Sequence, residues 1–179
     1  MHKHLTKDGR YFSIRQPNQA DAESIIQYSK ILFASTDQLL TTVEEYIMTV
    51  DEEKKWINES LQNPSKLVLI AELNNQIIGL LFFTAQMKKK NSHTGEFGVS
   101  VHPTYQYIGV GRALIETLLI WSNNNNQIEK VFLNVLATNV NAIKLYKNMG
   151  FIEEGRHIKA IKQKSGEYVY NIQMYIETK

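Results

Sequence analysis

Short segments of the chain alternate between apolar and polar residues with a period of two, which predicts strands. Residues 11–15 alternate in this way and end at Gln16-Pro17, so an opening strand is expected there. Residues 66–73 form a nearly continuous apolar run, which is typical of a strand covered on both faces. Asn74-Asn75 follows, and because asparagine tolerates a positive φ, the pair predicts a tight hairpin. The later strands are expected at residues 76–86, 93–101 and 128–136, and in a hairpin after Phe151 with its tip at Ser165-Gly166.

Other segments carry apolar residues three and four positions apart, which predicts helices. Asn18 can cap a first helix that ends near Lys30, and residues 32–40 are interpreted as a loop. Two capping boxes follow, of which the first predicts a short helical turn and the second predicts a helix that ends at Asn63-Pro64. These boxes are Thr42-x-x-Glu45 and Thr49-x-x-Glu52. The last two helices are expected from the pair Gly109 and Gly111 to about Trp121, and from Asn139 to Gly150.

The predicted order of elements is a strand, two helices, three strands, a helix, a strand, a helix and a terminal hairpin. This order indicates an α/β protein in which a mixed sheet carries helices on its faces. The length of 179 residues fits one domain, because a chain of this size buries roughly 70% of its unfolded surface in a single core.

Composition and charge exclude several classes of protein. The absence of cysteine excludes a disulfide framework and any thiolate nucleophile. The formal net charge is +2, and Lys88-Lys89-Lys90 is interpreted as a solvated hairpin tip rather than a nucleic-acid patch. The chain contains neither an apolar run of about 18 residues that could span a membrane nor the apolar segment of an export signal at its start. We therefore expect a soluble, cytoplasmic protein with no nucleic-acid or membrane partner.

Candidate chemistry lies where the strand at residues 93–101 gives way to the third helix. The strand ends at His102-Pro103, and the helix begins at Gly109 and Gly111. Glycines at the start of a helix leave backbone N–H groups pointing outward at the positive end of the helix dipole. Such an arrangement favours an anion, most naturally a phosphate.

Two familiar phosphate-binding loops do not match this segment. The nucleotide-hydrolase loop requires G-x-x-x-x-G-K-[ST], and no glycine here precedes Lys-Ser or Lys-Thr at that spacing. The dinucleotide fingerprint requires a third glycine at the position of Leu114. The motif that remains is Gln106-x-x-Gly109-x-Gly111, which on its own also fits a glycine-rich helix start without a ligand.

A second motif about thirty residues later makes the interpretation specific. It reads Asn139-x-x-Ala142-x-x-Leu145-Tyr146-x-x-x-Gly150-Phe151, and it follows Gln106-x-x-Gly109-x-Gly111 and a strand that ends V-x-V-x-P. Together these motifs resemble those of the GCN5-related N-acetyltransferase (GNAT) family. The resemblance covers residues 11–176, with the specific motifs in a core at residues 97–151. It implies a single N-acetyltransferase domain over residues 1–179, with a mixed, mostly antiparallel sheet of about seven strands and about four helices.

The resemblance implies a site for acetyl-CoA as co-substrate. The backbone of the strand before the loop would pair with the pantetheine arm, as an added strand pairs with a sheet edge. Backbone amides of the glycine loop would hold the pyrophosphate, and Asn139 would hydrogen-bond the cofactor near its thioester. Tyr107 and Ile108 replace small or basic residues of many relatives, so Arg112 would assist the backbone. The cofactor-binding residues expected are Val99, Val101, Gln106, Tyr107, Ile108, Gly109, Val110, Gly111, Arg112, Asn139 and Tyr146.

Tyr146 and Glu96 are the catalytic candidates. Tyr146 matches the tyrosine thought to protonate the leaving thiolate in the family, and a positioned phenol suits charge that develops on sulfur. Some relatives carry a glutamate base at the position of Asn134, which cannot take a proton. Glu96, on the strand before the pantetheine segment, is therefore the candidate base. Two alternatives stay open, a water relay and a structural role for Glu96 in a pair with His93 or Lys66.

The expected function is acetyl-CoA-dependent transfer of an acetyl group to a primary amine of a small molecule or a protein N-terminus. Two other functions stay open: a non-catalytic CoA-binding or regulatory module, and an acyltransferase that uses a larger acyl-CoA. Residues 35–49 and the terminal hairpin would shape the acceptor site, and the last strands suggest a homodimer surface. His93, His102 and His157 have no ligand spacing, so no metal site is expected.

Overall fold

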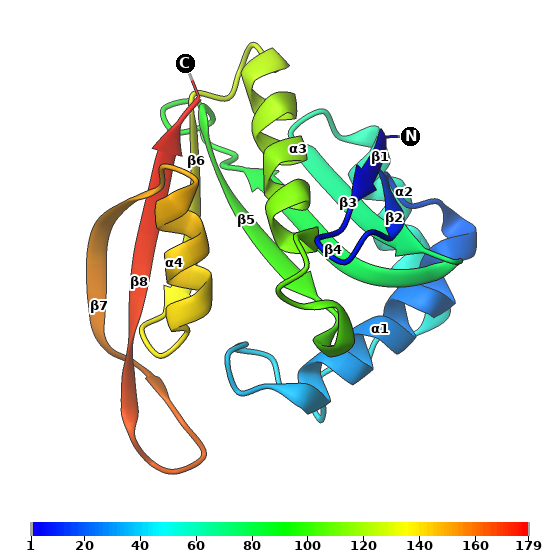
Figure 1. Cartoon of the computed structure of the whole chain (residues 1–179). Coiled ribbons are helices and arrows are strands. Elements are labelled where there is room, and N and C mark those ends of the chain that lie inside the picture. The colour runs from blue at the N-terminus through cyan, green and yellow to red at the C-terminus, as the bar shows by residue number, and fades with distance from the viewer. Residues whose placement is uncertain (1, 179) are drawn as a thin grey trace.

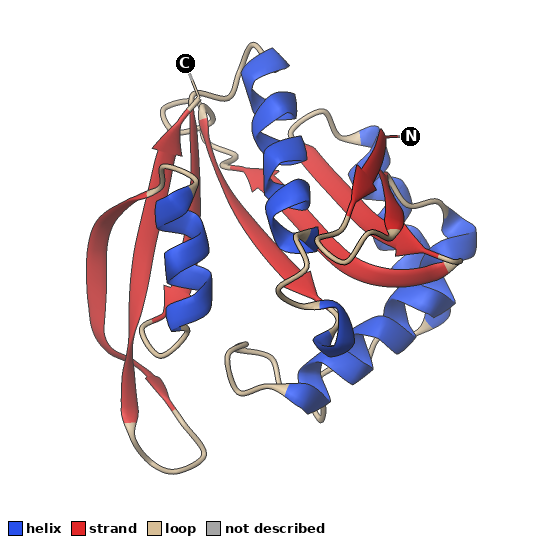
Figure 2. Ribbon diagram, in the orientation of Figure 1, coloured by secondary structure: helices blue, strands red, loops and turns tan. Residues whose placement is uncertain are grey.

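One sheet of eight strands, in the order β1-β2-β3-β4-β5-β6-β8-β7, organises the chain (Figures 1 and 2). The computed structural model describes residues 2–178. Neighbouring strands are antiparallel except β5 and β6, which are parallel. The predicted α/β class with a mixed, mostly antiparallel sheet is confirmed. The strands are β1 (His2–Leu5), β2 (Tyr11–Arg15), β3 (Lys66–Leu73), β4 (Gln76–Ala85), β5 (Thr94–Val101), β6 (Lys130–Leu136), β7 (Ile152–Lys162) and β8 (Tyr168–Glu177).

Within the described residues, four α-helices flank the sheet, and two of them begin at the predicted caps. Thr49 forms a complete capping box with Glu52, and the Asn139 side chain accepts a hydrogen bond from the Ala142 N–H. The short turns Gln19–Asp21 and Pro103–Tyr105 are 3₁₀ helices. The α-helices are α1 (Ala22–Ser35), α2 (Val50–Gln62), α3 (Val110–Asn124) and α4 (Val140–Asn148).

The prediction that the first helix ends near Lys30 is wrong. The first helix continues to Ser35, because Leu32 lies at helical spacing from the buried face of α1 and is itself only 6% exposed. The Thr42-x-x-Glu45 motif forms a short turn at residues 43–45, as predicted, in which the Glu45 carboxylate accepts the Thr42 N–H at 2.9 Å.

The helices cover the two faces of the sheet in pairs. Leu114 and Leu118 of α3 and Tyr146 of α4 belong to a large apolar core on one face. Ile25 of α1 and Ile57 of α2 pack in a smaller core on the opposite face. Strand β3 contributes alternate residues to the larger core and Ile70 to the smaller one, which confirms that this apolar run is a strand covered on both faces.

The eighth strand, β1, has no counterpart in the sequence prediction. Its four residues, His-Lys-His-Leu, carry too little apolar alternation to predict a strand, yet they pair with β2 from His2↔Ile14 to Leu5↔Tyr11. The connecting turn is held by the buried Thr6, whose N–H donates to the Arg10 carbonyl at 2.8 Å. Backbone pairing with β2 and the hydrogen bonds of the turn therefore stabilise β1, although its sequence has no apolar pattern.

Strands β5 and β6 separate soon after they meet. β5 pairs with β4 over residues 95–101 but with β6 only at residues 94–96, opposite residues 130–132. We call the stretch that follows, residues 97–101 of β5 and 133–136 of β6, the β5–β6 opening. Figure 1 shows the two strands together at one end and apart at the other, with α4 in front of β6. The backbone groups along this opening have no partner strand, and apart from the Val101 carbonyl, which accepts the Gln106 side-chain amide at 3.3 Å, they can bind an extended ligand.

Among residues 2–178, none of the helices combines the length and the apolar character that a bilayer crossing requires.

Glu53 of α2 is a buried acidic residue that is only 3% exposed. Burial raises the pKa of Glu53 to about 7 from an ordinary value of 4.5. The folded chain thus holds this proton at a pH where the unfolded chain has lost it. The free energy of unfolding therefore falls as pH rises from about 4.5 to about 7, and this loss persists at higher pH.

The Glu53→Gln variant tests this contribution, because glutamine cannot ionise. We expect it to raise the free energy of unfolding at pH 8 by about 1–2 kcal/mol, with little change at pH 4.5. Urea unfolding at several pH values measures the effect, with Glu59→Gln on the exposed side of the same helix as control. An unchanged pH dependence in Glu53→Gln would contradict the assignment.

Candidate active site

A cavity of about 710 Å³ lies at the β5–β6 opening. The end of β5, the loop before α3, and helix α4 form its walls, and the segment after α1 adds Thr36, Gln38 and Leu39. With Lys7 of the turn between β1 and β2, the cavity collects groups from five separate regions of the chain. The sequence-predicted residues that line it are Val99, Val101, Gln106, Tyr107, Gly109, Gly111, Arg112, Asn139 and Tyr146.

The start of α3 has the backbone of an anion site. Gly109 has φ +105°, a left-handed conformation that favours glycine, and it provides no side-chain cap. The first intrahelical bond runs from the Ala113 N–H to the Gly109 carbonyl at 3.0 Å. The N–H groups of residues 110–112 have no carbonyl of a preceding helical turn to bond. No side chain caps them, whereas a side chain caps the start of α2 and of α4. An anion at this point would receive their hydrogen bonds.

Two predicted cofactor residues, Ile108 and Val110, do not line the cavity with their side chains. Val110 is 1% exposed and belongs to the large core, and Ile108 packs against that core. Because the side chains of Ile108 and Val110 pack on the core and hold the loop in place, only their backbone groups can contact a ligand.

The charge of the cavity lining is entirely positive. Lys7, Arg112 and Lys144 line it, and the lining contains no aspartate or glutamate. The chain as a whole carries a formal charge of only +2, so this concentration is local. Such a lining favours a polyanion such as a group of phosphates.

Two hydrogen bonds connect elements across the cavity. Asn141 of α4 donates to the Tyr107 hydroxyl at 3.0 Å, and Tyr107 itself has φ +64°. Thr138 donates to the Gln38 side chain at 3.0 Å, across 100 residues of sequence. The sequence predictions missed Lys7, Asn141 and Lys144, because no local motif marks residues that meet only through the fold, and they included Gln38 only within residues 35–49, the segment expected to shape the acceptor site.

Tyr146 lies in the wall of the cavity and is 7% exposed. Its ring packs at near right angles to Phe97, with 6.2 Å between centroids, and against Phe151 at 5.9 Å. Burial raises the pKa of the Tyr146 phenol to about 12. The hydroxyl thus keeps its proton throughout the neutral range and can act as a hydrogen-bond donor.

Asn139 lines the cavity and also caps α4. Its Oδ1 accepts the Ala142 N–H at 3.3 Å, which occupies the carbonyl end of the side chain. The amide Nδ2 is the end that can donate to a ligand.

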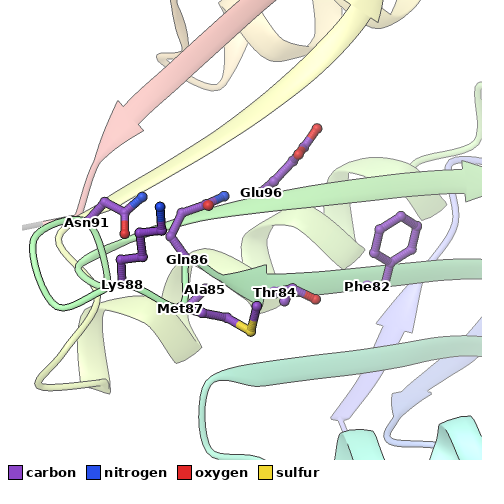
Figure 3. A pocket seen from close by; sticks show the side chains of 8 residues that line it. All are labelled: Phe82, Thr84, Ala85, Gln86, Met87, Lys88, Asn91 and Glu96. Atoms are coloured by element: carbon purple, nitrogen blue, oxygen red, sulfur yellow. The ribbon is translucent and has the colours of Figure 1, made fainter.

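Glu96 lies on the opposite face of the sheet from Tyr146. Phe97 contributes to the core beneath α3 and α4, so strand alternation directs Glu96 the other way. Glu96 lines a second cavity of about 520 Å³ and accepts a hydrogen bond from Asn134 Nδ2 at 2.8 Å. The partner in the structure is thus Asn134, neither His93 nor Lys66. Figure 3 shows this cavity, in which Glu96 of β5 lies beside Phe82 and Thr84 of β4 and near the loop residues Met87, Lys88 and Asn91.

The two catalytic candidates therefore line different cavities, but the β5–β6 opening lies between them. Glu96 is the last β5 residue paired with β6, so it stands at the closed end of the opening. Asn134 stands on the β6 side and receives a bond from Asn171 of β8 at 3.2 Å. A ligand in the opening is thus accessible from both faces of the sheet.

The described residues contain no group of three or more His, Cys, Asp or Glu side chains that could hold a metal ion.

Comparison with known proteins identifies the class. A sequence model described as the acetyltransferase (GNAT) family matches residues 33–151. The L-amino acid N-acetyltransferase AaaT of Escherichia coli is 30% identical over 114 residues, which cover 64% of this chain and 70% of that protein. The chain belongs to the GNAT family, and it is an N-acetyltransferase by class.

Solved structures agree in fold. An acetyltransferase of the GNAT family from Streptococcus pneumoniae superposes with a TM-score of 0.89 at 23% identity, covering 93% of this chain and 99% of that one. A putative acetyltransferase, yncA from Salmonella typhimurium, solved with its cofactor acetyl-CoA, gives a TM-score of 0.81 at 20% identity and covers 94% of each chain.

Proposed function

We propose that this protein transfers the acetyl group of acetyl-CoA directly to a primary amine, on a small molecule or a protein N-terminus. The observation that carries the proposal is the cavity at the β5–β6 opening, which joins unpaired strand edges, the uncapped start of α3 and the buried Tyr146 hydroxyl. The yncA structure with acetyl-CoA and the name of the E. coli relative support the cofactor and an amine acceptor.

The residues of the cavity fit the parts of acetyl-CoA. The opening exposes the backbone of Val99 and Val101, which matches the amide-bearing pantetheine arm. The N–H groups at the start of α3 and the positive lining match the phosphates. When bound, acetyl-CoA supplies an activated acyl thioester.

Tyr146 has the role of hydrogen-bond donor to the thioester sulfur. Its pKa of about 12 lies above the roughly 8.5 of an ordinary thiol, so the phenol stabilises developing thiolate charge without giving up its proton fully. The aromatic packing around Tyr146 holds the ring in place for this role.

Glu96 has the role of proton acceptor for the amine. An amine must be neutral to attack a carbonyl, and most primary amines are protonated at pH 7. The amine would approach through the face that bears Glu96, while Tyr146 acts from the other face. Asn134 and Asn171 hold the Glu96 carboxylate at the closed end of the opening.

The direct test is release of free thiol from acetyl-CoA in the presence of a panel of amines. The panel contains amino acids, a polyamine, an aminoglycoside and a peptide with a free N-terminus. Thiol release that depends on one amine class supports the proposal. Tight binding of acetyl-CoA with no release for any amine would favour a non-catalytic CoA-binding module, and faster release from succinyl-CoA would favour a larger acyl donor.

Tyr146→Phe tests the donor role. The variant keeps the ring and its packing but loses the hydroxyl, so we expect turnover to fall about 100-fold, with acetyl-CoA affinity within about twofold of the wild type. Thiol release gives turnover and calorimetry gives affinity. Tyr11→Phe, on the exposed side of β2 and outside the cavity lining, is the control. Full turnover in Tyr146→Phe would sink the donor assignment.

Glu96→Gln tests the base role. We expect kcat/KM to fall about 100-fold at pH 7 and by less at high pH, where more of the amine is already neutral. A pH profile of thiol release measures this difference, and the exposed Glu129→Gln is the control. A wild-type profile in Glu96→Gln would remove Glu96 from the mechanism and leave the water relay.

A further inference from the structure

The turn between β1 and β2 is docked on the loop that precedes α3. The Lys7 N–H donates to the Ile108 carbonyl at 3.0 Å. The Arg10 guanidinium lies over the Tyr105 ring, 5.2 Å from its centroid. The turn therefore contacts both the 3₁₀ segment and the glycine loop, although almost one hundred residues separate them in sequence.

The turn has a defined shape of its own. The buried Thr6 hydroxyl donates to the Arg10 carbonyl at 2.9 Å and accepts the Arg10 N–H at 2.8 Å. Gly9 takes φ +85°, and its N–H donates to the Thr6 carbonyl at 3.0 Å. Asp8 pairs with Arg10 at 2.6 Å. Because these contacts hold the turn closed, the position of Lys7 is fixed relative to the glycine loop.

Lys7 lines the same cavity as Gly109 and Arg112. Arg112 forms an ion pair with Glu116 at 3.2 Å. The carboxylate next to Lys7 in sequence, that of Asp8, forms its ion pair with Arg10. The ion pairs within residues 2–178 do not include Lys7. Its ammonium group is thus a cation available to a ligand at the start of α3.

We propose that Lys7 is a phosphate-binding residue of the cofactor site, so that the N-terminal hairpin forms part of the acetyl-CoA cavity. The proposal rests on the proposed function, since it takes CoA as the ligand. An ammonium group supplies a compact positive charge to phosphate oxygens, while the backbone N–H groups of α3 supply directed hydrogen bonds. The phosphate concerned is either the pyrophosphate or the 3′-phosphate of CoA, which share this chemistry.

Calorimetric binding of CoA to the full chain tests the proposal without knowledge of the acceptor. We expect Lys7→Ala to weaken CoA binding about fivefold at low salt, and Lys7→Glu to weaken it further. The loss shrinks at higher salt, because salt screens an exposed charge. Lys3→Ala, on the exposed part of β1 and outside the cavity lining, is the matched control and keeps wild-type affinity.

Dephospho-CoA, which lacks the 3′-phosphate, identifies the phosphate. Equal losses for CoA and dephospho-CoA in Lys7→Ala place Lys7 at the pyrophosphate, and a loss for CoA alone places it at the 3′-phosphate. Wild-type affinity in both Lys7 variants, with unchanged thermal unfolding, would overturn the proposal. A wild-type protein that does not bind CoA would instead overturn the proposed function, so the two failures are distinguishable.

Discussion

The loss of pairing between β5 and β6 is the constraint on which the site depends. The two strands share a ladder for three residues and then separate, while each keeps its other neighbour. Phe97, Tyr146 and Phe151 pack together near the point of separation, with centroids 5.7 to 6.2 Å apart. The separated strands leave backbone donors and acceptors along the opening without a partner strand, which favours a ligand that carries amides. At the uncapped start of α3, the first backbone N–H groups likewise lack an acceptor and can donate to an anion.

Much of the fold follows from local sequence signals. The bounds of β2 and β3, the positive φ values of Asn74 and Asn75, and the caps Thr49 and Asn139 all match the sequence predictions. These features depend on periodicity or on one side chain bonded to a nearby backbone group, and both are visible in a short window. The extension of α1 past Lys30 and the existence of β1 depend on packing and pairing with distant segments, which such a window does not contain.

The candidate site divides in the same way. The glycine loop and the Asn139–Phe151 motif are each a short continuous stretch of sequence. The sequence therefore predicts the glycine-rich backbone at the start of α3 and the presence of Tyr146 in the cavity. The positive lining is different, because Lys7, Arg112 and Lys144 come from three separate elements. The placement of Glu96 on the opposite face follows from strand alternation, but its bond to Asn134 requires the register of β5 and β6, which only the fold defines.

Amide hydrogen exchange with and without acetyl-CoA tests the central claim, that the cofactor occupies the β5–β6 opening and the start of α3. We expect slower exchange at Val99–Val101 and at Val110–Arg112, with little change in β2 and β3. Binding that protects a different surface, or no protection at saturating acetyl-CoA, would contradict it.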